Sequence, residues 1–181
     1  MISGKAGHGK DTAAKMIADY LTAKEYKILI VHFADLVKFY ASQYFNWDGE
    51  KNEDGRFLLQ WIGTHLMRTN YPTYWAEIIG QFIDAITKTN KFDVILIPDW
   101  RFINEYETIY DYAQLQNNEV ITLRIIRPNY VNPNMTKEQQ QHISEIELDD
   151  FAFDWIIENQ GNLEEFNSSI QYMIDLMPGL W

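Results

Sequence analysis

The stretch that most constrains the fold of this chain is the glycine-rich segment Gly4–Thr12, GKAGHGKDT. Gly4 and Gly9 frame four residues and Lys10 follows them, which is the P-loop pattern. Its glycines let the backbone turn tightly enough to aim successive N–H groups at one anion, and the helix that begins at Lys10 favours negative charge at its first turn. The segment therefore predicts a site for nucleotide phosphates. The residues expected to bind the nucleotide there are Gly4, Ala6, Gly7, His8, Gly9, Lys10, Asp11 and Thr12.

The segment departs from the usual pattern in two ways. Asp11 stands where a serine or threonine normally holds Mg²⁺, but a carboxylate is also a hard oxygen ligand, so Asp11 remains a metal candidate. Thr12 could then bond an α-phosphate oxygen. Only three residues precede Gly4, whereas a P-loop normally follows a buried strand. The first strand is therefore short or truncated, and we favour the interpretation that Met1 is an internal start of a longer chain.

Composition limits the classes of function. The 181 residues are 46% hydrophobic, which suits one domain with a full core. The 26 acidic and 15 basic residues give a net charge of −11, which disfavours nucleic acid and anionic membranes as partners. The chain has no cysteine, which excludes disulfides and thiolate chemistry. It also shows neither an apolar run of membrane-spanning length nor a signal peptide, so we expect a cytoplasmic protein that acts on a small anion.

Apolar runs of strand length alternate with helical patterns along the chain. The predicted strands after the first are 27–33, 93–98, 119–126 and 153–157, and the run at 27–33 is typical of a strand buried on both faces. This alternation predicts an α/β fold with a parallel sheet of about five strands, covered by helices on both faces. We expect a single domain over 1–181, with a helical insertion at about 46–90 split near Pro72 and a polar, lid-like segment at about 128–145.

Charged residues follow two of the predicted strands. In open parallel sheets, ligands bind beyond the carboxyl ends of the strands, so Asp35 and Lys38 are substrate-binding candidates. Asp35 could equally be a simple helix N-cap. Asp99 ends another strand, where an acid can organise Mg²⁺ and its water, and Arg101 follows it. The predicted metal ligands are Asp11 and Asp99.

The insertion carries an arginine beside aromatic residues. Arg68 and Tyr71 lie in the corner between the two predicted helices, and Trp75 begins the second helix. This combination suits an aromatic base with a phosphate nearby. The alternative is a solvated arginine above core aromatics.

Six motifs then stand in order along the chain. They are GKAGHGKDT at 4–12, Phe33-Ala34-Asp35-x-x-Lys38, Gly63-Thr64…Arg68…Trp75, Asp99-x-Arg101-Phe102-x-Asn104-Glu105, His142-x-Ser144-Glu145 and Ile157-x-Asn159. From Gly4 to about Phe166 this order resembles the phage deoxynucleoside monophosphate kinases, within the nucleoside monophosphate kinase-like P-loop family. The resemblance implies a P-loop kinase-type three-layer fold.

The resemblance also implies an activity, namely transfer of phosphate from ATP-Mg²⁺ to a dNMP to give ADP and a dNDP. Catalytic roles would fall to Lys10, Arg68, Arg101 and Arg127, with Arg68 and Arg101 holding the acceptor phosphate. Asp35, Tyr71 and Trp75 would contact the acceptor's sugar and base, and Asn159 would lie near the adenine of ATP. His142 and Glu145 match the family pattern without an assigned role, and Ser144 with Glu147 also fits a capping box. A homodimer is left open.

Other functions remain open. The same layout resembles dephospho-coenzyme A kinase and other small-metabolite kinases, whose acceptor is not a nucleotide. A nucleotide-binding regulatory ATPase would use the P-loop but would not need Arg68 and Arg101 together. A nucleic-acid-acting ATPase is disfavoured by the charge of −11 and the absence of a basic stripe.

Overall fold

The structure is a computed structural model that describes residues 1–177. Its strands are all parallel and short: β1 (Ile2–Ser3), β2 (Ile28–Ile30), β3 (Val94–Leu96), β4 (Leu123–Ile126) and β5 (Trp155–Glu158). They form a three-stranded sheet, β1-β4-β5, and a two-stranded sheet, β2-β3. A bridge between Ser3 and Trp100, and a 2.8 Å bond from the Ile2 N–H to the Ile97 carbonyl, join the two sheets beside β1. The strand order is therefore β2-β3-β1-β4-β5.

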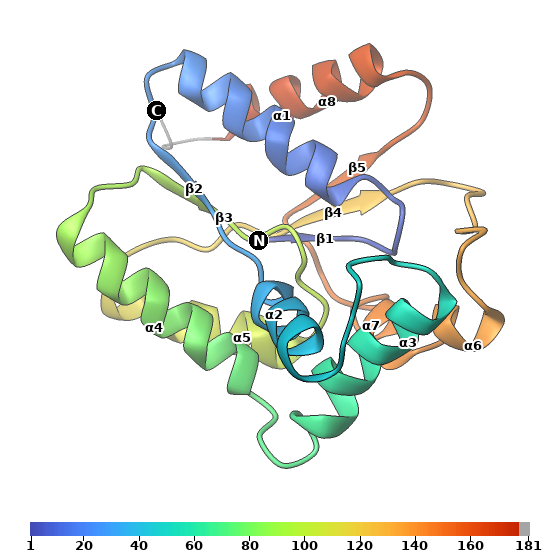
Figure 1. The fold of residues 1–181 in the computed structure, drawn as a ribbon. Helices are drawn as coiled ribbons and strands as arrows, with labels where there is room; N and C mark the ends of the chain where they lie inside the picture. Colours follow the sequence, from blue (N-terminus) through green and yellow to red (C-terminus); the bar gives the residue numbers. More distant parts are fainter. Residues whose placement is uncertain (178–181) are drawn as a thin grey trace.

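Helices cover both faces of this sheet (Figure 1). The longer ones are α1 (Lys10–Ala23), α2 (Ala34–Tyr44), α4 (Tyr74–Thr89), α5 (Ile103–Leu115) and α8 (Leu163–Leu176). The shorter ones are α3 (Glu53–Gln60), the π-helix η1 (Trp61–Leu66), α6 (Lys137–Gln140) and α7 (Ile143–Ile146). Helices α1 and α8 lie side by side on one face, and α4 and α5 lie on the other. The predicted α/β architecture, a parallel sheet between helical layers, is confirmed.

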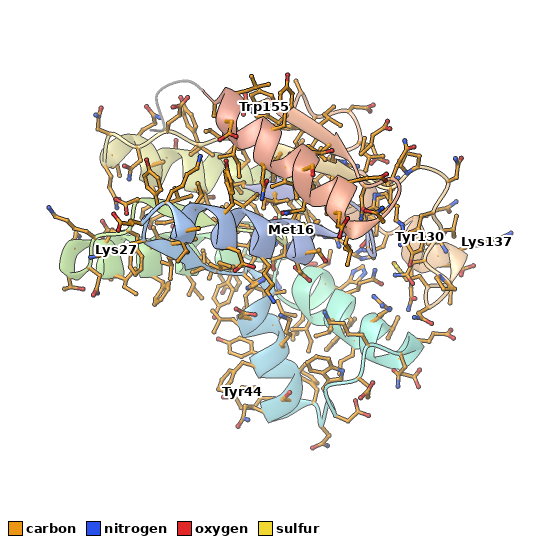
Figure 2. The ribbon with its side chains drawn as sticks, turned by 90° about the horizontal axis from the view of Figure 1, so that it is seen from above. Met16, Lys27, Tyr44, Tyr130, Lys137 and Trp155 are labelled. Carbon is orange, nitrogen blue, oxygen red and sulfur yellow. The ribbon has the colours of Figure 1, made fainter. Side chains whose placement is uncertain are left out.

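Three apolar clusters account for this arrangement. One fills the space between the sheet and the α1/α8 layer, and the second packs the opposite face around Trp100. The third lies away from the sheet, where Val37 and Ala41 of α2 meet Ile62 of η1 and Trp75 of α4. Burying a large apolar side chain contributes roughly 1.5–3 kcal/mol, so this third cluster gives the α2–α4 region a core of its own. Helices α2, α3 and η1 project from the sheet as a helical arm, with Tyr44 of α2 at its tip in Figure 2, whereas α4 lies against the sheet beside α5.

Two expectations about the strands are wrong. The run at 27–33 is not buried on both faces, because β2 lies at an edge of the sheet and its Ile30 is 39% exposed. The run at 119–126 is a strand only from Leu123, because its pairing with β1 begins where Ile2 lies opposite Leu123. Apolar runs alone could not reveal either fact, because strand order and register depend on contacts between distant segments.

The insertion follows its expected outline with adjusted boundaries. Its first helix begins at Glu53 rather than Arg56, because the Asn52 side chain caps it by accepting the Gly55 N–H at 2.8 Å. This helix continues directly into η1, and Pro72 lies in the turn before α4, as expected. Across residues 1–177, no helix is both long and apolar enough to cross a membrane. The last four residues of the expected domain lie outside the described part.

Candidate active site

The P-loop connects β1 to α1 at the centre of the sheet. Gly9 caps the helix with a φ of 101°, so the N–H groups of the first turn face the loop. Gly4 has a φ of 147°, and a Cβ there would lie 2.4 Å from the Ile125 carbonyl oxygen. Only glycine fits this contact, which lets the loop cross directly above β4. The result is an anion-binding geometry at the N-terminus of a 14-residue helix.

Lys10 lies inside this loop and not on its surface. Its side chain is buried, and Nζ donates to the Lys5 carbonyl at 3.1 Å. Burial, with a further contribution from the positive charge of Arg101, lowers the pKa of Lys10 from 10.5 to about 7. The ammonium thus lacks sufficient negative charge around it. A bound phosphate would supply that charge.

Arg101 reaches the same loop from beyond β3. Its Nη1 lies 3.0 Å from Oε1 of Glu145 and donates to the Ser144 carbonyl at 3.2 Å. The other carboxylate oxygen of Glu145 accepts the Ala6 N–H of the P-loop at 2.8 Å. The structure therefore brings Lys10 and Arg101 together, as expected, and adds Glu145 between the P-loop and Arg101.

Asp99 holds the backbone at the start of α2. Its two oxygens accept the N–H groups of Phe33 at 3.0 Å and Ala34 at 2.8 Å. Burial raises the pKa of the Asp99 carboxyl, while those donors and nearby His32 and Lys38 act in the opposite direction. Each oxygen keeps a further lone pair, so a metal ligand role is compatible with this geometry.

The other predicted acids lie nearby but are more open. The Asp11 side chain is 80% exposed, with Oδ1 4.0 Å from Nε2 of His32. Nδ1 of His32 lies 3.4 Å from Asp35, which also pairs with Lys38 at 2.9 Å. No three His, Asp or Glu side chains in the described part of the chain could hold a metal by themselves. This donor set suits Mg²⁺, which usually takes one or two carboxylates and completes its shell with water and phosphate oxygens.

The terminal nitrogens of the Arg68 guanidinium contact the protein itself, whereas its buried Nε has no hydrogen-bond partner among the described residues. Its guanidinium pairs with Glu105, donates to the Pro72 carbonyl at 3.2 Å and to Asn104 at 3.3 Å, and lies 3.9 Å from the Phe102 ring centre. The other Glu105 oxygen accepts the backbone N–H of Arg101 at 2.7 Å. Burial raises the pKa of Glu105 to about 7, and the positive charge of Arg68 opposes only part of this rise. Arg68 thus braces the segment that carries Arg101.

The aromatic corner is only partly open. Trp75 is 1% exposed, and its indole N–H donates to the Gly63 carbonyl at 2.9 Å. It is a core residue, so in this structure it cannot stack on a base. The α2–α4 cluster needed a large apolar side chain at this position, and the sequence pattern could not separate that need from ligand binding. Tyr71, by contrast, is exposed at the turn before α4.

Residues that follow β4 and β5 approach the other side of the P-loop. The Arg127 N–H donates to Nδ1 of His8 at 3.1 Å, and its guanidinium lies 4.3 Å from the centre of the Tyr130 ring. A Cβ on Gly7, whose φ is 83°, would come within 2.6 Å of Tyr130. Asn159 donates to the His8 carbonyl at 2.9 Å. The structure thus brings Arg127, expected to be catalytic, and Asn159, expected to bind the nucleotide, to the loop. Burial lowers the pKa of His8, which contacts both residues.

Sequence reasoning gave Tyr130 no role, and it identified Gln139 only as part of a capping pattern with Thr136, which the structure confirms. Tyr130 covers the P-loop glycine, and its only signal in the sequence is an aromatic residue close behind Arg127. Gln139 is buried, and its Nε2 donates at 3.0 Å to the carbonyl of Glu53, the first residue of α3. Figure 2 shows Tyr130 and Lys137 at the same side of the molecule. Gln139 therefore fastens the lid-like segment to the insertion.

The motif at 142–145 serves two purposes. His142 caps α7 by accepting the Ser144 N–H through Nδ1 at 3.3 Å, so the predicted capping box of Ser144 and Glu147 is wrong. The imidazole of His142 also lies in edge contact with His65 of η1, at 6.1 Å between ring centres. Burial and the nearby His65 lower the pKa of His142. The cap frees Glu145 to face the P-loop and Arg101.

Comparison with known protein families gives a match for this chain. A family described as deoxynucleotide monophosphate kinase matches residues 32–170 of the chain. The chain belongs to this family. The match includes Asp35, Asp99, Arg101, Glu145 and Asn159 but begins after the P-loop sequence, so the family assignment does not depend on that loop.

A curated relative points the same way. The chain is 30% identical over 124 residues to the deoxynucleotide monophosphate kinase of Enterobacteria phage T4. This similarity covers 67% of the chain and 46% of the relative, so the chain matches about half of the length of the phage protein. The resemblance to a phage kinase expected from the six motifs is confirmed.

Proposed function

We propose that this protein transfers the γ-phosphate of ATP to the 5′-phosphate of a deoxynucleoside monophosphate, giving ADP and a deoxynucleoside diphosphate. The observation that carries the proposal is the convergence of Lys10 and Arg101 at the P-loop. Lys10 belongs to the loop that would hold the donor, and Arg101 extends from the end of a neighbouring strand. Two cations from different elements suit the joining of two phosphates.

Positioning and charge neutralisation would do most of the catalytic work. The P-loop N–H groups and Lys10 would hold the β- and γ-phosphates of ATP, and Arg101 would hold the acceptor phosphate. Arg127 would neutralise charge from the lid side. The attacking acceptor oxygen is already ionised, so no strong general base is needed. Arg68 would act through Glu105, by keeping the backbone of Arg101 in place.

The residues present fit a magnesium ion. Asp11, with its exposed carboxylate, Thr12 and Asp99 would hold it directly or through water. The chemistry that Mg²⁺ would supply there is neutralisation of the negative charge on the phosphate oxygens. Asp35 and Tyr71 remain candidates for the acceptor's sugar and base, and Asn159 for the adenine.

An acceptor screen tests the proposal. The purified chain is incubated with ATP-Mg²⁺ and, in separate reactions, each common dNMP and NMP, and ADP release is measured. We expect release that depends on one or a few dNMPs. Release that ignores every acceptor would indicate a regulatory ATPase, and release only with dephospho-coenzyme A would indicate another metabolite kinase.

A matched pair of variants links the activity to the P-loop. Lys10→Met removes the charge inside the loop, and Lys15→Met removes an exposed lysine from the same helix. Lys10→Met should reduce turnover by orders of magnitude, because one preorganised charge at a phosphate is worth about 10²–10³ in rate. Lys15→Met should behave as the unaltered chain. Equal activity of both variants would remove the P-loop from the mechanism.

A further inference from the structure

Glu145 is the carboxylate that touches both halves of the candidate active site. Its side chain is 7% exposed, one oxygen accepts the P-loop N–H of Ala6 at 2.8 Å, and the other lies 3.0 Å from Nη1 of Arg101. We propose that Glu145 is a positioning residue that fixes the Arg101 guanidinium relative to the P-loop and so sets the affinity for the acceptor phosphate. This inference rests on the proposed kinase function.

The charges in the site explain why a carboxylate is useful there. Lys10 and Arg101 are close enough for Arg101 to lower the pKa of Lys10, and both side chains are largely buried. Without a counter-charge, Arg101 would be repelled from Lys10 towards solvent. Glu145 supplies that charge, and within residues 1–177 both Glu145 and the Ser144 carbonyl contact the guanidinium through Nη1. The other guanidinium N–H groups would then be available to a phosphate, which arginine can bind through two parallel hydrogen bonds.

The fold around Glu145 does not depend on this contact. Asp149 holds the P-loop separately. Its Oδ2 lies 2.8 Å from Nζ of Lys5 in the loop, and its Oδ1 lies 2.5 Å from Nη2 of Arg124 in β4. The cap of α7 is made by His142. Replacement of Glu145 by glutamine therefore leaves two other supports for the loop and the short helix, and the variant tests positioning rather than folding.

Two substitutions at this position separate the two contacts. In Glu145→Gln, the side-chain oxygen can still accept the Ala6 N–H, while the ion pair with Arg101 is lost. In Glu145→Ala, both contacts are lost. The matched control is Glu147→Gln, which changes a carboxylate of the same segment that accepts the Ile103 N–H at 2.8 Å, outside the site.

Steady-state kinetics with dNMP and ATP varied in turn give the readout, and thermal unfolding of each variant confirms that it is folded. We expect Glu145→Gln to raise the KM for the dNMP about tenfold or more, since hydrogen bonds to charged groups are worth that factor. The KM for ATP should change by less than about twofold, because the contact with Ala6 remains. Glu145→Ala should raise both values, and Glu147→Gln should change neither.

A double-mutant cycle with Arg101→Ala decides whether Glu145 acts through Arg101. In the Arg101→Ala background, Glu145→Gln should have no further effect on the dNMP KM. The same rise in that background, or an unchanged KM in the single Glu145→Gln variant, would overturn the proposal while leaving the kinase function intact. An unaltered chain that phosphorylates no dNMP would instead refute the proposed function, and with it this role of Glu145.

Discussion

Lys10 gives the sharpest test of the electrostatics in the candidate site. Burial lowers its pKa from 10.5 in the open chain to about 7 in the folded protein. The unfolded chain therefore binds more protons between these two values, and stability must rise with pH across that range. At pH 7 the shifted pKa of this one side chain lowers the free energy of unfolding by about 4 kcal/mol, and at pH 9.5 it lowers it by only about 1 kcal/mol.

Lys10→Met removes this cost and keeps most of the side-chain volume. It also removes the 3.1 Å hydrogen bond to the Lys5 carbonyl, which is worth about 1 kcal/mol. We therefore expect the variant to be more stable than the unaltered chain by about 3 kcal/mol at pH 7, while catalysis is lost. The difference should fall by about 3 kcal/mol on going to pH 9.5, whatever the value of the lost hydrogen bond.

Urea unfolding of both chains between pH 7 and pH 9.5 measures this difference directly. Lys15→Met, at an exposed position of the same helix, serves as the control and should show no pH-dependent gain. A stability difference between Lys10→Met and the unaltered chain that stays constant across this range would refute the reasoning. So would a Lys10→Met variant that is less stable than the unaltered chain at pH 7.

Three further predictions follow from the contacts around the site. Arg68→Ala should lower the free energy of unfolding by about 3 kcal/mol in urea titrations, because it leaves Glu105 buried without its ion-pair partner. A decrease below about 1 kcal/mol, the usual value of an exposed ion pair, would contradict the buried pairing. Gly7→Ala should raise the KM for ATP, since its Cβ would lie 2.6 Å from Tyr130. A second change, Tyr130→Ala, should then lower that KM again in part. If it does not, the effect of Gly7→Ala comes from backbone strain alone and not from the contact with Tyr130. Finally, the Kd for ATP should rise with pH above about 7, by up to about tenfold per pH unit. The reason is that Lys10, whose pKa is about 7 before ATP binds, must take up a proton when the phosphates bind. Calorimetry in buffers of different ionisation enthalpy should show this proton uptake, and Lys10→Met should abolish it.

The features that sequence reasoning predicted well are local ones. The P-loop, the alternation of strands and helices and the break at Pro72 each depend on a few neighbouring residues, whose backbone preferences and apolar spacing are visible in the sequence. The motif from Asp99 to Glu105 is equally local. It placed Arg101 at a strand end, close to where the structure shows it.

The features that were missed depend on partners far apart in the chain. The carboxylate of Glu145 meets the P-loop across 139 positions, and no spacing rule connects two such residues. Arg68 and Trp75 had the right chemistry for a ligand, yet Glu105 engages the first and the α2–α4 core buries the second. Whether a polar or aromatic side chain serves a ligand or the protein depends on which surfaces pack together.

The sequence by itself therefore determined that this chain has a glycine-rich loop between a strand and a helix on an α/β scaffold, because turns, helix starts and apolar strands are set by adjacent residues. Only the tertiary structure decided that β2 lies at the sheet edge, that Arg68 braces Glu105 and that Glu145 joins the P-loop to Arg101. Each of these depends on the packing of segments that are remote in sequence, and burial then sets the pKa values of Lys10 and Glu105 near 7.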